Sequence, residues 1–149
     1  MKKIVVDTNI IFSCLLNTQG KIGDLLFNSD EVFEFYSNDY MRLEIHKHWA
    51  KLKKISKLKE DDLETAYEKL LSKLVFINEE SIPKEIWEKA EQIVIDFDID
   101  DLDFVALTKY IKGSLWTGDK ILHFGLKEKR FRTVYNTDEL LKLRNRLVT

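Results

Sequence analysis

Cysteine is nearly absent from this sequence, and the long apolar runs of membrane proteins are missing altogether. Cys14 is the only cysteine among 149 residues, which excludes a disulfide framework and fits a reducing compartment. The amino-terminal apolar run, Ile4-Val5-Val6, is far too short for a signal sequence or a membrane span. We therefore expect a cytoplasmic protein with no membrane partner.

An excess of positive charge is lacking as well. The formal net charge is -2, so the composition does not announce a nucleic-acid-binding protein, although a local basic patch could still serve. Apolar residues make up 44% of the chain and charged residues 34%, which predicts an ordered globular protein. A chain of this length is typical of one domain and buries roughly 70% of its unfolded surface. We expect a single domain over residues 1–149.

Short apolar runs alternate with amphipathic segments along the chain. The run Ile4-Val5-Val6 is apolar at consecutive positions, which predicts a strand buried on both faces of a parallel sheet. We predict strands at about 4–6, 32–36, 75–77, 115–116 and 132–135. We predict helices at about 10–16, 24–28, 40–52, 61–73, 83–94, 101–111 and 119–127, then a last helix capped by Thr137. This alternation predicts an α/β domain with a central parallel sheet of about five strands flanked by helices.

The densest charge in the chain lies between Asp96 and Asp103, where five acids fall within eight residues. Carboxylates so close together repel one another, and a helix N-terminus or a divalent cation can offset their charge. An apolar helical run follows at once from Phe104. The stretch is therefore a candidate for one part of a metal site.

Further acids are expected at the same edge of the sheet. Asp7 directly follows the first strand, and Asp119 follows the strand at 115–116 by way of Thr117-Gly118. The carboxyl ends of parallel strands share one edge, where the sites of open sheets form. Glu44, in the helix after the second strand, is a fourth candidate. Without a Cys or His cluster, such carboxylates suit Mg²⁺ or Mn²⁺ rather than zinc, and they support phosphodiester hydrolysis.

Four segments resemble the acidic motifs of PIN-domain ribonucleases, in the order in which that family has them. The segment Val5-Val6-Asp7-Thr8-Asn9 is similar to the opening motif, and Arg42-Leu43-Glu44-Ile45 supplies a Glu where the family has its second acid. Residues 101–108 resemble the third motif, an Asp followed by an apolar helix, and residues 115–122 resemble the fourth. The set spans essentially the whole chain, and it is most similar to the VapC-like toxins of type II toxin–antitoxin pairs.

The resemblance implies a three-layer PIN-like domain that acts as a metal-dependent endoribonuclease on RNA. It implies four catalytic acids that hold Mg²⁺ or Mn²⁺: Asp7, Glu44, Asp101 and Asp119. Asn9 and Thr117 would be supporting groups that orient a carboxylate or a water. The resemblance also implies a cognate antitoxin that blocks the site, and homodimers are common in such families.

Within the acidic stretch, the favoured ligand is Asp101, because it precedes the apolar residues 104–107 at the family's spacing. Asp98 is the second choice, as a group outside the direct metal ligands. The other acids are expected to cap helices or to carry solvated charge: Asp96, Asp100 and Asp103.

A basic run extends from Lys47 to Lys59. Lys51, Lys53 and Lys54 are candidates for RNA binding, because a basic rim would offset the repulsion between an acidic pocket and phosphate. The alternative interpretation is an ordinary solvated helix end.

Other functions also use acids at the ends of parallel strands. A receiver-like signalling domain needs an acid pair after the first strand and an Asp after the third, whereas this chain has only Asp7 and then Asn78. A phosphohydrolase with an aspartate nucleophile typically has Asp-x-Asp after the first strand, and the segment Asp7-Thr8-Asn9 has one acid. A catalytically silent protein-binding module on the same fold would bind a partner and show no metal-dependent cleavage.

Overall fold

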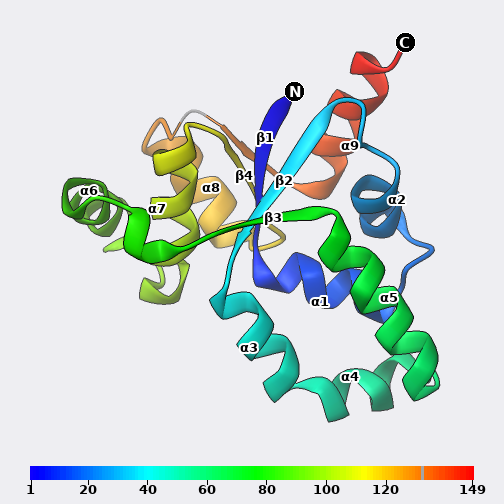
Figure 1. The fold of residues 1–149 in the computed structure, drawn as a ribbon. Helices are drawn as coiled ribbons and strands as arrows, with labels where there is room; N and C mark the ends of the chain where they lie inside the picture. The colour runs from blue at the N-terminus through cyan, green and yellow to red at the C-terminus, as the bar shows by residue number, and fades with distance from the viewer. Residues whose placement is uncertain (132) are drawn as a thin grey trace.

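Five parallel strands form the centre of the molecule in a computed structural model that describes residues 1–131 and 133–149 (Figure 1). The strands are β1 (Lys2–Val6), β2 (Phe33–Asn38), β3 (Leu74–Ile77), β4 (Ser114–Trp116) and β5 (Val134–Tyr135). Their order is β3-β2-β1-β4-β5, and Val5 of β1 lies opposite both Tyr36 of β2 and Leu115 of β4. The predicted α/β class and five-stranded parallel sheet are confirmed. Of the strand predicted at 132–135, Arg132 lies outside the described residues.

Nine α-helices lie in the described part of the chain, together with two 3₁₀ turns, η1 (Glu79–Ser81) and η2 (Ile99–Asp101). The helices are α1 (Thr8–Leu16), α2 (Lys21–Phe27), α3 (Tyr40–Lys47), α4 (Trp49–Ser56), α5 (Glu60–Ser72), α6 (Lys84–Val94), α7 (Leu102–Ile111), α8 (Lys120–Glu128) and α9 (Thr137–Leu147). Within the described residues, none of them has the length and apolar character that a membrane span requires.

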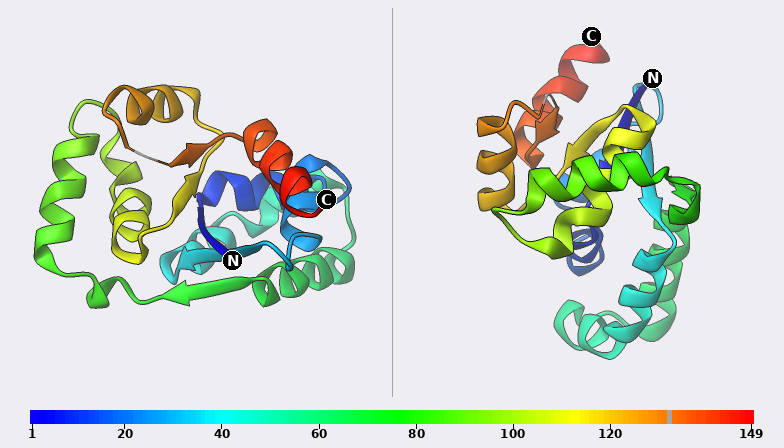
Figure 2. Two further views of the ribbon diagram at one scale, coloured as in Figure 1. Left: turned by 90° about the horizontal axis from the view of Figure 1, so that it is seen from above. Right: turned by 90° about the vertical axis from the view of Figure 1, so that its left-hand side faces the viewer.

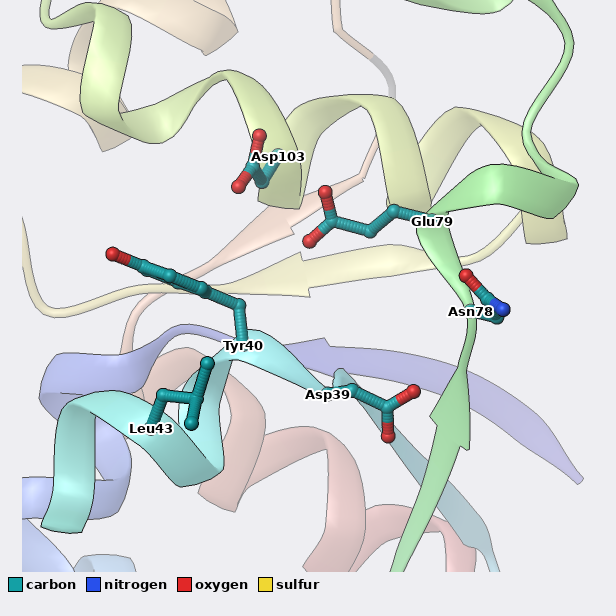
Figure 3. Close-up of a pocket in the computed structure, with 6 residues that line it drawn as sticks. All are labelled: Asp39, Tyr40, Leu43, Asn78, Glu79 and Asp103. Atoms are coloured by element: carbon teal, nitrogen blue, oxygen red, sulfur yellow. The ribbon is translucent and has the colours of Figure 1, made fainter.

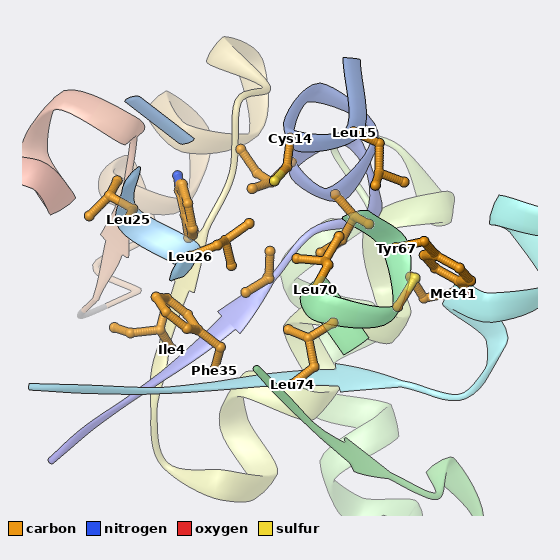
Figure 4. Close-up of a cluster of buried hydrophobic side chains, with 14 of the residues drawn as sticks. Ile4, Cys14, Leu15, Leu25, Leu26, Phe35, Met41, Tyr67, Leu70 and Leu74 are labelled. Carbon is orange, nitrogen blue, oxygen red and sulfur yellow. The ribbon is translucent and has the colours of Figure 1, made fainter. Parts of the chain in front are cut away.

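Helices cover both faces of the sheet and complete three layers (Figure 2). Ile4 and Val6 of β1 pack with α1, α2, α5 and α9, whereas Val5 between them packs with α6, α7 and α8. Figure 4 shows the first of these clusters, in which Ile4 and Phe35 of the sheet meet side chains of α1, α2 and α5. Because consecutive side chains of a strand point to opposite faces, a strand buried on both sides is apolar throughout.

After β1 the chain continues over one face of the sheet, and after β4 it continues over the other face. This divergence places a crevice at the carboxyl ends of the two strands. Helices α1 and α2 lead from β1 to β2 over one face, and α8 leads from β4 to β5 over the other. Ligand sites of open parallel sheets form at such a switch point. In Figure 1, the carboxyl ends of β1 and β2 lie in the lower half of the picture, where α1 and α3 begin.

The single helix predicted over residues 40–52 is wrong, because α3 and α4 are separate helices that meet at His48. His48 has φ -106° and ψ 16°, and its N–H donates to the carbonyls of Glu44 and Ile45 at 3.2 Å each. The bend lets α4 pack against α1 and keeps Leu52 buried. Tertiary packing thus overrides a local pattern that contains neither Gly nor Pro.

Asn136, and not the predicted Thr137, caps α9. Asn136 Oδ1 accepts a hydrogen bond from Glu139 N at 2.8 Å, and Glu139 Oε1 accepts one from Asn136 N at 3.0 Å, which is a capping box. Thr137 is the first helical residue, and its hydroxyl accepts a hydrogen bond from Trp116 Nε1 at 3.1 Å. The prediction of Thr137 as the cap is wrong because its hydroxyl bonds to Trp116 in the folded protein.

Polar contacts through Glu139 and Arg144 tie α9 to the other elements. Lys127 Nζ donates to Glu139 at 2.7 Å, and His123 Nε2 lies 2.5 Å from the same carboxylate. Burial alone would raise the pKa of Glu139, but hydrogen bonds from the capping residue's backbone, from Lys127 and from His123 hold that pKa at about 2. At the other side of the helix, the buried Arg144 donates to Asp24 at 2.6 Å.

Candidate active site

Asp7 stands where β1 ends and α1 begins, so both elements fix its position. Its Oδ1 accepts a hydrogen bond from Asn9 N at 2.8 Å as the cap of α1, and its Oδ2 accepts one from Thr117 Oγ1 at 2.9 Å. The residue is only 5% exposed. Burial raises the pKa of Asp7; the bonds from Asn9 and Thr117 oppose that shift, and the charge of Asp119 adds to it. Asp7 is therefore a helix cap and also a tightly held carboxylate.

Thr117 connects the ends of the two central strands. It follows β4, whose Trp116 lies opposite Val6 of β1, and its side chain is completely buried. Its hydroxyl donates to Asp7 Oδ2 and accepts a hydrogen bond from Asp119 N at 3.1 Å. The Thr117 hydroxyl thus fixes the side chain of Asp7 and the backbone of Asp119.

Asp119 caps the N-terminus of α8. Its Oδ1 accepts hydrogen bonds from the backbone N–H groups of Ile121 at 2.9 Å and Leu122 at 3.1 Å. These bonds satisfy two of the donors that every helix leaves free at its start. The capping role and a role in the site are compatible, because only one of the two carboxylate oxygens makes these bonds.

Asp101 ends η2 and directly precedes α7, so α7 begins one residue later than predicted. Its Oδ2 is buried and has no hydrogen-bond partner among the described residues. Burial, and after it the charges of Asp7, Asp119 and Asp98, raises the pKa of Asp101 to about 7. An unpartnered buried carboxylate oxygen costs free energy unless a ligand satisfies it.

Glu44 lies one turn into α3 and is half-buried. Burial raises its pKa; the neighbouring His48 lowers it, while Asp7 and more distant acids raise it. Because Glu44 and Asp7 are electrostatically coupled, the helix after β2 brings its acid to the same crevice as the strand β1.

All four predicted acids line one cavity of about 820 Å³ at the carboxyl edge of the sheet. The predicted Asn9 and Asp98 line it too, whereas Thr117 is buried behind Asp7. Asp98 Oδ1 accepts a hydrogen bond from Asp100 N at 3.0 Å and so caps η2. The geometry therefore brings together the residues that the sequence motifs single out.

The cavity also includes residues that the sequence analysis missed. Two acids that were predicted to cap helices or to carry solvated charge line it: Asp100 and Asp103. Lys47 and His48, at the junction of α3 and α4, line it as well. Burial raises the pKa of Asp103, which is not the behaviour of a freely solvated carboxylate. A usable signal existed for Lys47, since residues three apart on a helix share a face and Lys47 follows Glu44 by three.

Asp103 lines a second, smaller pocket of about 280 Å³ beside the main cavity (Figure 3). Its other lining residues are Asp39, Tyr40, Leu43, Asn78 and Glu79. The buried Oε1 of Glu79 has no hydrogen-bond partner in the described part of the chain, and burial with neighbouring acids raises its pKa to about 7. No sequence motif pointed to Glu79.

The three lysines predicted to bind RNA differ in their surroundings. Lys51 lines a groove of about 420 Å³ that adjoins the acidic cavity and shares Glu44 with it. Lys53 Nζ lies 2.9 Å from Glu60 Oε2. Neither Lys53 nor Lys54 lines the cavity or the adjoining groove.

The acids face a common space without closing on one point. Across residues 1–131 and 133–149, no three Asp, Glu, His or Cys side chains are grouped closely enough to hold an ion between them. What the cavity provides is a set of hard oxygen donors, including the unpartnered Asp101 Oδ2. That chemistry is of the kind that binds Mg²⁺ and Mn²⁺.

The fold and the site define a class: an open parallel α/β domain with carboxylates gathered at its switch point. Among protein-family models, the PIN domain matches residues 5–139. The chain therefore belongs to the PIN domain family, a family of nucleases. The predicted resemblance of the chain to this family is confirmed.

Two solved structures share the fold. VapBC2 from Rickettsia felis, crystallised bound to a DNA fragment from their promoter, matches with a TM-score of 0.66 at 14% identity, covering 90% of this chain and 98% of that chain. PAE2754 from Pyrobaculum aerophilum matches with a TM-score of 0.64 at 11% identity, covering 97% of this chain and 90% of that chain. A search of curated proteins found no match.

The strand order argues against a receiver-like domain. Receiver domains have the order 2-1-3-4-5, whereas the strand order here is β3-β2-β1-β4-β5. In addition, β3 ends at Ile77 and is followed by Asn78, where a receiver needs an Asp. The position after β3 therefore offers no aspartate to phosphorylate.

Proposed function

We propose that this PIN domain is a metal-dependent endoribonuclease that hydrolyses RNA phosphodiester bonds. The observation that carries the proposal is the meeting of four carboxylates, from four separate segments, in one cavity at the switch point of the sheet. Burial, and after it repulsion from Asp7 and Asp119, raises the pKa of Asp101. A divalent cation would offset that repulsion.

Mg²⁺ or Mn²⁺ fits the residues present. Asp7, Asp101 and Asp119 would hold the ion, Glu44 would complete the set, and Asp98 would stand outside the direct ligands. Mg²⁺ usually binds one or two protein carboxylates and keeps several waters, so it suits acids that line a cavity without closing on a point. A bound ion supplies an activated water and stabilises the charge that develops on the phosphate.

The chain's own side chains hold these acids in place. Thr117 fixes Asp7 Oδ2 and the backbone of Asp119 with a single hydroxyl, and the backbone N–H of Asn9 fixes Asp7 Oδ1. The exposed Asn9 side chain lines the cavity, where it is available to bind a water or a phosphate oxygen. These contacts orient the acids before substrate arrives, which lowers the reorganisation required during the reaction.

We further propose that the protein is the toxin of a type II toxin–antitoxin pair and that a cognate antitoxin blocks the cavity. The fold similarity to VapBC2 from Rickettsia felis supports this proposal. Expression of the chain alone should arrest growth, and co-expression with the antitoxin should restore it. A homodimer stays a prediction.

The direct test is cleavage of single-stranded RNA in Mg²⁺ or Mn²⁺, with and without EDTA. Asp7→Asn and Asp119→Asn should each abolish cleavage and growth arrest while the circular dichroism spectrum stays unchanged. Asp96→Asn is the matched control, because Asp96 belongs to the same acidic stretch but pairs with Lys129 at 2.9 Å. Full cleavage by both site variants, or cleavage that survives EDTA, would contradict the proposal.

A further inference from the structure

One side of α3 faces the acidic cavity along its whole length. Tyr40, Leu43, Glu44 and Lys47 all line the cavity, at the three- and four-residue spacing that places side chains on one helical face. From Tyr40 to Lys47 the helix rises roughly 10 Å. The carboxylate of Glu44 lies between an aromatic ring at one end and an ammonium group at the other.

Tyr40 is unusually accessible for an aromatic residue at the start of a helix. It is 54% exposed, and the neighbouring Leu43 is 63% exposed. In Figure 3, which draws the smaller pocket, the Tyr40 ring lies below Asp103 and extends away from Glu79 and Asn78. The ring therefore contributes little to the core and leaves its faces open to a ligand.

Lys47 is the only Lys or Arg among the described residues that line the cavity. Every other charged group there, His48 apart, is an acid, so a phosphate that approaches from the Tyr40 end meets repulsion and one that approaches from the Lys47 end meets attraction. Lys51 extends this positive end into the adjoining groove. The face of α3 thus carries an aromatic ring at the Tyr40 end, which suits a nucleobase, and a positive charge at the Lys47 end, which suits a phosphate.

We propose that this face of α3 aligns one single RNA strand across the carboxylates: a nucleobase stacks on Tyr40, and a phosphate on the other side of the scissile bond contacts Lys47. The inference rests on the proposed nuclease function and names the substrate contacts of the same site. Aromatic side chains stack on bases of any sequence, and lysines neutralise backbone phosphates. Tyr40 and Lys47 would thus contact the substrate directly, and neither is placed among the acids that hold the ion.

The test measures binding separately from cleavage. A fluorescently labelled RNA oligonucleotide is titrated by anisotropy into Asp7→Asn protein that carries either Tyr40 or Tyr40→Ala. The same titrations use oligonucleotides in which one base at a time is replaced by an abasic site. Phe124→Ala is the matched control, because Phe124 is 67% exposed and lies on α8 in a different pocket.

We expect Tyr40→Ala to raise the Kd about tenfold for intact RNA, and Tyr40→Phe to leave it unchanged. With the protein that retains Tyr40, removing the base at one position of the RNA should raise the Kd by the same factor. With that abasic RNA, Tyr40→Ala should cause no additional rise in the Kd. Lys47→Ala should lower the slope of log K against log salt by about 0.7. Lys89→Ala should not, because Lys89 is an exposed residue of α6 that lines neither the cavity nor the adjoining groove. In wild-type background, Tyr40→Ala should raise KM and spare kcat.

An equal loss for intact and abasic RNA, or no loss at all, would overturn the proposal for Tyr40. An unchanged salt slope in Lys47→Ala would overturn the proposal for Lys47. Both failures leave cleavage by wild-type protein as evidence for the nuclease. Conversely, a Tyr40-dependent base effect without any metal-dependent cleavage would support the strand-binding face and reject the nuclease function.

Discussion

Replacing Thr117 by Val removes one hydroxyl from the centre of the site while keeping the shape of the side chain. The variant leaves Asp7 Oδ2 without its donor and Asp119 N without its acceptor. A hydrogen bond to a charged group contributes ~1.5–3 kcal/mol, and the backbone bond at the rim of the cavity adds ~0.5–1 kcal/mol. Asp7 is 5% exposed, so water does not readily replace the lost donor. We expect the free energy of unfolding to fall by ~2–3 kcal/mol once the easier burial of Val is allowed for.

Urea unfolding followed by tryptophan fluorescence measures this loss, because Trp116 is fully buried next to the substituted position. Thr117→Ser is the control, since it keeps the hydroxyl and gives up only the burial of a methyl group, ~1 kcal/mol. Thr117→Val should also bind Mn²⁺ more weakly than Thr117→Ser in a calorimetric titration. A loss in Thr117→Val that is no larger than the loss in Thr117→Ser would refute the assignment of the two hydrogen bonds.

Three further predictions concern stability. Asp101→Asn should raise the free energy of unfolding of the metal-free protein more at pH 8 than at pH 5, by ~1–2 kcal/mol after solvent screening, as urea titrations at the two pH values would measure. The reason is that the pKa of Asp101 is raised from 3.8 to about 7, so its ionisation costs increasing stability across that range; equal gains at both pH values would contradict this. Glu139→Gln should lower the free energy of unfolding by ~1–2 kcal/mol at pH 7. This loss should shrink as the pH falls from 4.5 toward 2, because the folded-state pKa of Glu139 is about 2. Urea titrations between pH 3 and 7 measure the loss, and a constant loss would be evidence against the ion pair. Arg144→Ala should lower the free energy of unfolding by ~2–3 kcal/mol, because it removes a buried guanidinium and its partly buried contact with Asp24. Arg144→Lys should restore part of the loss, and a neutral effect would mean that the contact is unimportant.

The positions of Asp7 and Asp119 follow from the sequence because a parallel sheet has only one edge at which its strands end. Short apolar runs locate those ends, and the residue after each run lands at the switch point. The same reasoning places Asp101. An acid directly before a helix that runs back along the sheet lies at the carboxyl edge of the sheet, where that helix begins. These residues lie at the observed cavity as predicted.

The contacts that secure the acids depend on information that no local pattern carries. Thr117 and Asp7 are 110 residues apart, and their bond exists only because β1 and β4 are neighbours. Tyr40 and Asp103 line the cavity because of where α3 and α7 dock. The cap of α9 is different: Asn136 and Glu139 have the three-residue spacing of a capping box, so the sequence held a signal that favoured Asn136 over Thr137.

The hydroxyl bridge between the first strand and the fourth has a consequence for the protein during its synthesis. During translation, β1 and Asp7 leave the ribosome well before the partner hydroxyl at Thr117, which follows Asp7 by 110 residues, and before the acid at Asp119. A growing polypeptide with the first two acids in place still lacks the strand that closes the crevice. The carboxylate cluster is thus assembled only after β4 and Asp119 have emerged, and a product truncated before Thr117 lacks both the hydroxyl bridge and Asp119.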